Sequence, residues 1–268
     1  MCSLNRLHSP CAFALASLVL AVLTVSAPRS HAEDEDPTQG TPIFLKWSTG
    51  FDFSRGDYGL DEPTTLFYVP FGVALDYRRF RAKIFMPFLA SLGPTQIDTN
   101  ETVLETGERP GFGQLQVAAS YLFDPLAVGL PYFELGAGVS APTETRRELG
   151  TGHWSLEIHA DLFRQFGRIT PFLSAGRKFY LPCDCDRSLD DRFFASFGAS
   201  YELSGIASIG IAYDWLAAAR GDAEDSHEIV PFASFRLSDV WTVGPYAVVG
   251  LSDGSPDYGL GFSLSVRQ

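Results

Sequence analysis

The sequence predicts an all-β protein: a transmembrane antiparallel β-barrel of about twelve strands in up-and-down meander order. Three observations predict it: an amino-terminal secretory signal, segments of about ten residues in which apolar and polar side chains alternate, and connections that alternate between long and short. Together they are typical of bacterial outer-membrane barrels, whose strands present alternate residues to lipid and to the lumen.

Residues 1–32 have the pattern of a secretory signal peptide. Arg6 supplies positive charge, Cys11–Ala27 is apolar, and Ser30-His31-Ala32 provides the small residues of a cleavage site. Residues 33–42 are acidic and contain Pro and Gly, so we expect a flexible periplasmic lead-in. We expect residues 43–268 to form the barrel.

Composition narrows the class of protein. Aromatic residues make up 13% of the chain and charged residues only 19%, below the usual quarter. The most apolar stretch after the signal, Tyr121–Pro142, contains Asp124 and Pro131, which disfavours a membrane-spanning helix. After signal removal, 18 basic and 32 acidic residues would remain. A chain with this excess of acidic residues lacks the positive charge that binding to nucleic acid requires.

The last segment shows the alternation most clearly. Large apolar residues occupy Tyr258, Leu260, Phe262, Leu264 and Val266, and the positions between them are Gly259, Gly261, Ser263, Ser265 and Arg267. Since successive strand residues point to opposite faces, one face meets an apolar phase and the other a polar one. The same pattern predicts twelve strands, at residues 43–54, 65–77, 80–92, 112–123, 131–141, 153–164, 169–181, 193–203, 206–218, 228–238, 241–252 and 257–267.

Connection lengths predict the orientation of the barrel. Long connections include Gly93–Gly111 and Pro142–Gly152, whereas Arg78-Arg79 and Ser204-Gly205 are short. Outer-membrane barrels have long outer loops and short periplasmic turns, so we expect both termini in the periplasm. A soluble β-sandwich or a lipocalin-like barrel would also alternate. The signal peptide, the small residues on the second face and the loop asymmetry favour the membrane.

Several strings of the chain resemble one known family. They are Gly113–Tyr121 (GQLQVAASY), Glu134–Thr143 (ELGAGVSAPT), Leu149–Gly152, Ile169–Gly176 (ITPFLSAG) and Gly250–Gly261 (GLSDGSPDYGLG). In this order, the chain is similar to the outer-membrane channel family named for the MetA pathway of phenol degradation, over roughly residues 44–268. The resemblance implies a barrel associated with uptake of aromatic or other hydrophobic compounds. One departure is the carboxyl end, Ser265-Val266-Arg267-Gln268, which lacks the terminal aromatic typical of outer-membrane proteins.

The alternation also predicts which charges line the lumen. The candidates are Lys46, Asp52, Asp76, Arg81, Lys83, Glu134, Glu157, His159, Asp161, Glu202, Asp214, Arg236 and Arg267. Two interpretations remain open: a narrow pore whose charges select solutes, aided by space at inward Gly and Ser, or a lumen closed by ion pairs. Inward aromatics at Tyr68, Phe85, Phe172, Tyr180 and Tyr246 either form an apolar path or fill volume.

The sequence therefore favours a passive outer-membrane channel or facilitator for small, hydrophobic or aromatic solutes, without cofactor, metal or catalytic residues. Its expected partners are outer-membrane lipid, the insertion machinery and a small-molecule solute. A non-conducting structural or adhesive barrel is one alternative. An outer-membrane lipid hydrolase is a second, because His153-Trp154-Ser155 matches a His-x-Ser pattern. Cys183 and Cys185 form a close pair of undetermined role.

Overall fold

A computed structural model describes residues 43–58, 63–92, 97–99, 102–104, 110–145, 149–182, 189–219 and 223–268, with only the backbone at 97–99 and 102–104. The predicted signal peptide and lead-in lie outside these residues, as do Cys183 and Cys185. The structure is all-β: no described helix is long and apolar enough to cross a membrane.

Twelve long strands build the molecule. They are β1 (Ile43–Gly56), β2 (Thr64–Tyr77), β3 (Phe80–Leu92), β7 (Leu115–Phe123), β8 (Tyr132–Ala141), β9 (Ser155–Phe163), β10 (Ile169–Tyr180), β11 (Arg192–Ser204), β12 (Ala207–Leu216), β13 (Ser226–Arg236), β14 (Trp241–Gly250) and β15 (Tyr258–Arg267). Three short strands, β4 (Ile97–Thr99), β5 (Thr102–Leu104) and β6 (Gly111–Phe112), lie between β3 and β7.

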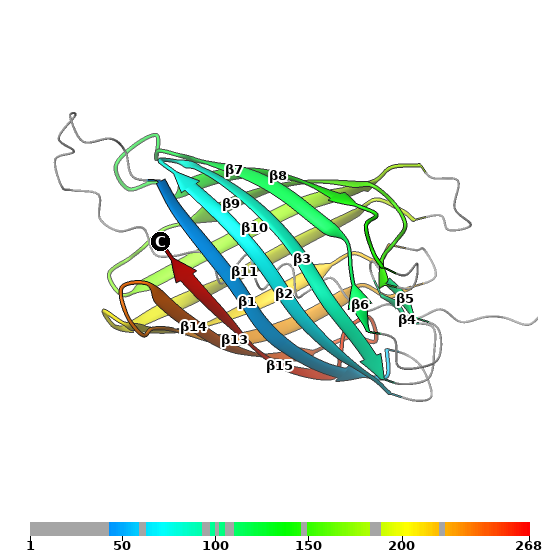
Figure 1. Cartoon of the computed structure of the whole chain (residues 1–268). Coiled ribbons are helices and arrows are strands. Elements are labelled where there is room, and N and C mark those ends of the chain that lie inside the picture. The colour runs from blue at the N-terminus through cyan, green and yellow to red at the C-terminus, as the bar shows by residue number, and fades with distance from the viewer. Residues whose placement is uncertain are drawn as a thin grey trace, which may run out of the picture.

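The long strands form a closed antiparallel barrel in meander order. Each pairs with its neighbours in sequence, and β1 pairs with β15 from Lys46↔Arg267 to Arg55↔Tyr258, which closes the cylinder. The strands are tilted relative to the barrel axis (Figure 1). The predicted fold, strand number and order are therefore confirmed.

The predicted strand at 112–123 is interrupted, because β3 pairs with β7 up to Phe85↔Gln116 and then with β6 at Phe88↔Phe112. Between these two register pairs, the β6–β7 segment contains one more residue than β3, and such an extra residue is a β-bulge. The N–H of Gly113 donates to the carbonyl of Pro87 at 2.9 Å and keeps the wall hydrogen-bonded there. Sequence alternation did not reveal this bulge. The β4–β5 hairpin, which forms a separate sheet, was not predicted either.

The two ends of the barrel differ. We call the end with β1's first residue, β15's last residue and the Arg78-Arg79 hairpin the turn end. The opposite end, where β8 ends at Ala141, β9 begins at Ser155 and β10 ends at Tyr180, is the loop end. Arg78 adopts a φ of 55°, the left-handed conformation that two-residue hairpins require.

The barrel presents an apolar belt to its surroundings. Large apolar side chains at alternate positions are exposed on the outer face, among them Ile84, Val117, Ile211, Leu260 and Phe262. Leu260 is 60% exposed, whereas its neighbour Gly259 is buried. An apolar surface that surrounds a closed barrel is stable only against hydrocarbon, so the belt identifies a membrane barrel.

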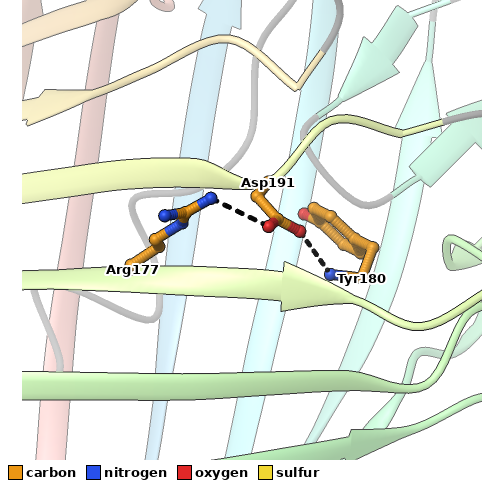
Figure 2. Close-up of polar contacts among 3 residues, drawn as sticks. All are labelled: Arg177, Tyr180 and Asp191. Atoms are coloured by element: carbon orange, nitrogen blue, oxygen red, sulfur yellow. Dashed lines mark hydrogen bonds and ion pairs between the residues drawn. The ribbon is translucent and has the colours of Figure 1, made fainter.

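One outward-facing arginine near the loop end, Arg177, forms an ion pair with Asp191 (Figure 2). The guanidinium of Arg177 on β10 lies 4.8 Å and 4.9 Å from the ring centroids of Phe179 and Phe193. Its Nη2 donates to Oδ2 of Asp191 at 3.0 Å, while Oδ1 of Asp191 accepts the backbone N–H of Tyr180 at 3.1 Å. Asp191 thereby joins the end of β10 to the residue before β11.

Candidate solute pathway

Inward glycines and aromatic rings pair across neighbouring strands. In each pair the two residues are direct register partners, and the pairs are Gly72–Phe85, Gly136–His159, Gly176–Phe194, Gly198–Phe172, Gly210–Phe232 and Gly261–Tyr246. In five of them a Cβ on the glycine would lie within 3 Å of the ring; Gly72 leaves 3.6 Å to Phe85. In these five pairs the ring thus occupies the space over its glycine that a side chain would need.

This pairing corrects one prediction from the sequence. Inward glycines were expected to leave space for a pore, but at Gly198, Gly210 and Gly261 the space belongs to a ring. The glycines still affect the bore, because a ring lying on the wall projects less into the lumen than one standing over a side chain. The rings become part of the lining.

Apolar side chains cover one side of the lumen, on β10 and β12–β14. Val230, Tyr246, Val248 and Ala212 form a buried cluster, and Phe172 and Phe232 pack against it. The ring centroids of Phe172 and Phe232 are 6.3 Å apart. We call these six residues the apolar wall.

A second apolar group lies on β2 and β3 and continues into a loop. Tyr68 packs against Phe85, with ring centroids 6.3 Å apart, and Leu89 lies beside them. Leu149, from the β8–β9 connection, is buried against Leu66 and Leu89. Since Leu66 and Leu89 face inward, Leu149 reaches into the mouth at the loop end and narrows it.

Hydrogen bonds hold that connection in place. Nε2 of Gln114 donates to Oγ1 of Thr151 at 3.0 Å, and the N–H of Gly152 donates to Oε1 of Glu144 at 3.0 Å. The glycine at 152 has a φ of 72°, which favours a residue without Cβ. These hydrogen bonds hold the described residues of the connection at the mouth of the barrel.

Charged residues line the side of the lumen formed by β3, β8 and β9. Glu134 on β8 is the register partner of Asp161 on β9. His159 has its Nδ1 3.3 Å from Oε1 of Glu157 and its Nε2 3.7 Å from Oδ2 of Asp161. Lys83 on β3 lies within electrostatic reach of all three carboxylates. We call these five residues the polar wall.

The turn end carries a second set of the predicted charges. Nε of Arg81 donates to Oδ1 of Asp76 at 2.6 Å. Lys46 lies within electrostatic reach of this pair and of Arg267, whose guanidinium lies 3.7 Å from the ring centroid of Phe44. Positively and negatively charged side chains therefore lie close together at the turn end.

Two predicted candidates lie at the rim instead of deep in the bore. Glu202 accepts a hydrogen bond from Nε2 of Gln165 at 3.4 Å, next to the β9–β10 turn. Arg236 is exposed and donates to the carbonyl of Gly205 in the β11–β12 turn. Among the predicted inward aromatics, Tyr180 likewise lies at a strand end, beside His153, with ring centroids 6.2 Å apart.

The loop-end half of the lumen holds charges that sequence reasoning partly missed. Asp52 and Asp214 were predicted, but Lys178, Arg192 and Glu228 were not, and all five are buried. Lys178 has the same parity as Phe172, so alternation alone would have found it. Arg192 and Glu228 lay at or beyond the expected strand ends, where alternation says little.

A protein-family model described as "Putative MetA-pathway of phenol degradation" matches residues 66–268. The chain belongs to this family. The resemblance found in the sequence strings is thereby confirmed. A comparison with curated proteins gives no match.

A solved outer membrane channel resembles this MetA-pathway family member in fold. The COG4313 outer membrane channel from Pseudomonas putida F1 superposes with a TM-score of 0.70 at 14% identity, covering 88% of this chain and 99% of that one. The translocator domain of the autotransporter NalP from Neisseria meningitidis has a TM-score of 0.46 at 12% identity, covering 86% and 89%. The KdgM porin in complex with oligogalacturonate has a TM-score of 0.45 at 7% identity, covering 84% and 97%.

The residues of the hydrolase hypothesis do not form a catalytic pair in this family member. Nδ1 of His153 lies 3.0 Å from the carbonyl of Leu181, and Oγ of Ser155 has no hydrogen-bond partner among the described residues. Both side chains are buried, away from the lipid-facing belt. A hydrolase would need the imidazole within hydrogen-bond reach of the hydroxyl. Among the described residues no group of three His, Cys, Asp or Glu side chains is placed to hold a metal ion.

Proposed function

We propose that this protein is a passive channel of the bacterial outer membrane for small solutes that are hydrophobic or aromatic in part. One observation carries the proposal: a closed membrane barrel whose lumen has an apolar wall on β10 and β12–β14 and a polar wall on β3, β8 and β9. Such a lumen contacts the two sides of an amphipathic solute differently. Neither surface would be needed in a barrel that serves only as an anchor.

The fold likeness to an outer membrane channel and the family membership support this proposal. We place the loop end outside the cell and both termini in the periplasm, because long loops face outward in such barrels. The outer-membrane lipid, the insertion machinery and a small-molecule solute are then its partners, and residues 1–32 its secretory signal.

Two measurements test the proposal. Protein refolded into planar bilayers should give discrete conductance steps, and proteoliposomes should take up benzyl alcohol faster than protein-free liposomes. Heat-modifiable migration on a gel verifies folding in both. Folded protein that neither conducts nor accelerates uptake would overturn the channel.

A non-conducting structural barrel is the second candidate. Leu149 in the mouth and the ion pairs at the turn end favour it, because both reduce the free bore. A Leu149→Gly variant separates the two functions. If the loop merely narrows a pore, this variant should conduct better than the wild type; if the lumen is closed by its own side chains, it should stay silent.

A further inference from the structure

Asp214 and Glu228 form a pair of buried acids in the loop-end half of the lumen. They are register partners on β12 and β13, so their inward side chains are cross-strand neighbours. Asp214 is 2% exposed and Glu228 is fully buried. Like charges directly opposite each other on a sheet are destabilising, so this pair needs a physical reason.

The two carboxylates are incompletely satisfied. Oε1 of Glu228 accepts a hydrogen bond from Oγ of Ser226 at 3.1 Å. Within the part of the chain that the structure describes, neither oxygen of Asp214 nor Oε2 of Glu228 meets the geometry of a hydrogen bond, and the only side chain that acts on the Asp214 carboxyl as a donor is the hydroxyl of Ser196. A buried carboxylate without a partner is costly. The arrangement therefore suits a donor that comes from outside the protein.

The two buried bases of the same half are attached to the barrel farther toward the loop end than this pair. Lys178 and Arg192 are register partners of each other on β10 and β11. The partner of Asp214 on β11 is Ser196, four residues closer to the turn end than Arg192. At about 3.3 Å per residue, this is a separation of roughly 13 Å along the strand.

The acid pair is continuous with the apolar wall. Ala212 lies two residues from Asp214 on β12, and Val230 lies two residues from Glu228 on β13, in both cases on the side nearer the turn end. Residues two apart on a strand share a face, so all four side chains point inward. Tyr246 of the same wall donates to a third acid, Asp52, at 3.0 Å. A solute that places a positive group between the acids lays its carbon portion on Val230 once the neighbouring side chains of the wall move aside, because Val230 is only 1% exposed.

We propose that Asp214 and Glu228 form a subsite for the protonated amino group of an amphipathic amine whose apolar part lies on the apolar wall. A primary ammonium brings three hydrogen-bond donors, enough for the unpartnered oxygens. A bare metal ion fits less well, because no third ligand of the usual kind is in place among the described residues. The subsite rests on the proposed function in one respect: the amine reaches it through the lumen.

Binding is measured without transport, so the two proposals fail separately. The protein is placed in lipid nanodiscs and titrated calorimetrically with benzylamine, with empty nanodiscs as the blank. Benzyl alcohol and benzoate are the neutral and anionic counterparts, and methylamine is an ammonium without a ring. We expect benzylamine to bind at least about tenfold more tightly than each of the other three.

Paired variants locate the site. Asp214→Asn with Glu228→Gln should weaken benzylamine binding at least about tenfold, whereas Asp124→Asn with Asp239→Asn, two acids in turn-end connections outside both walls, should leave it within about twofold. Val230→Thr should weaken benzylamine and leave methylamine unchanged. If the first double variant does not migrate as a folded barrel, Glu228→Gln alone replaces it.

Three results would overturn the subsite: equal binding of benzyl alcohol and benzylamine, wild-type affinity in the Asp214/Glu228 variant, or equal loss in the Asp124/Asp239 variant. Conductance without amine binding would leave the channel standing and remove the subsite. Amine binding without conductance would support the subsite and remove the channel.

Discussion

The hydroxyl of Tyr246 on β14 donates a hydrogen bond to Oδ2 of Asp52 on β1, 3.0 Å away, across the intervening strand β15. This contact passes over Gly261, which is the register partner of both residues. A Cβ at Gly261 would lie 2.4 Å from Cζ of the tyrosine and 2.5 Å from its oxygen. The bond between two strands that are not neighbours thus depends on a residue without a side chain.

Gly261→Ala should therefore destabilise the barrel. The ring of Tyr246 must leave the wall, which breaks its bond to the buried Asp52, and we expect a loss of about 1–3 kcal/mol in the free energy of unfolding. Denaturant titration in detergent, followed by tryptophan fluorescence, measures it. Gly138→Ala is the matched control, because its Cβ would meet only ordinary contacts from 3.4 Å upward. Equal stability of the two variants would refute the role of the glycine.

Removing rings from the apolar wall should separate ion flow from solute uptake. In a Phe172→Ala/Phe232→Ala variant the lumen is wider but less apolar, so single-channel conductance should rise while uptake of benzyl alcohol by proteoliposomes falls. Phe197→Ala, an outward-facing ring, serves as the control and should change neither. Uptake that rises in step with conductance would show that the wall only fills volume.

The Arg177–Asp191 ion pair should contribute little to stability despite its good geometry. Both side chains are partly exposed, at 42% and 33%, and exposed ion pairs are typically worth only about 0.2–1 kcal/mol. We expect Asp191→Asn to lower the free energy of unfolding by no more than that, since its side-chain oxygen still accepts the N–H of Tyr180. The effect should shrink in 1 M salt, where the Debye screening length is about 3 Å. A salt-independent loss above this range would mean that the contact organises the loop.

A charge on the apolar belt should be far more costly. Ile211 is 54% exposed on the outer face of β12, near the middle of the strand. Ile211→Arg should destabilise the folded barrel by about 2–4 kcal/mol in lipid vesicles. Ser208→Arg, which faces inward near the turn end, should cost much less. If both cost the same, no hydrocarbon surrounds β12.

Cysteine labelling checks the same belt chemically. In a Cys183→Ser/Cys185→Ser background, Leu260→Cys in vesicles should resist a water-borne maleimide and react with a lipid-dissolved one. Ser263→Cys faces the lumen and is the control, because Gly261 is covered by Tyr246 and would report that ring instead. Fast aqueous labelling at both positions would contradict the membrane assignment.

Alternation along the chain was sufficient to predict the wall of the barrel. Leu260 and Phe262 alternate with Gly261 and Ser263 because hydrocarbon lies on one side of the strand and the lumen on the other, and this constraint acts on every residue locally. Strand ends within three residues followed from it, with the bulge at Gly113 as the exception. The inward parity of Asp52, Asp214 and Tyr246 followed in the same way.

What these inward residues meet was decided only by the tertiary structure. Tyr246 and Asp52 are separated by 194 positions, and the register of two strand pairs brings them together over Gly261. The same holds for Asp214 beside Glu228 and for Leu149 against Leu66. The alternation of a strand specifies a face but not a register, since sliding one strand past another by two residues preserves the face and changes every neighbour. Closure of the barrel settles that register, and with it the lining of the lumen.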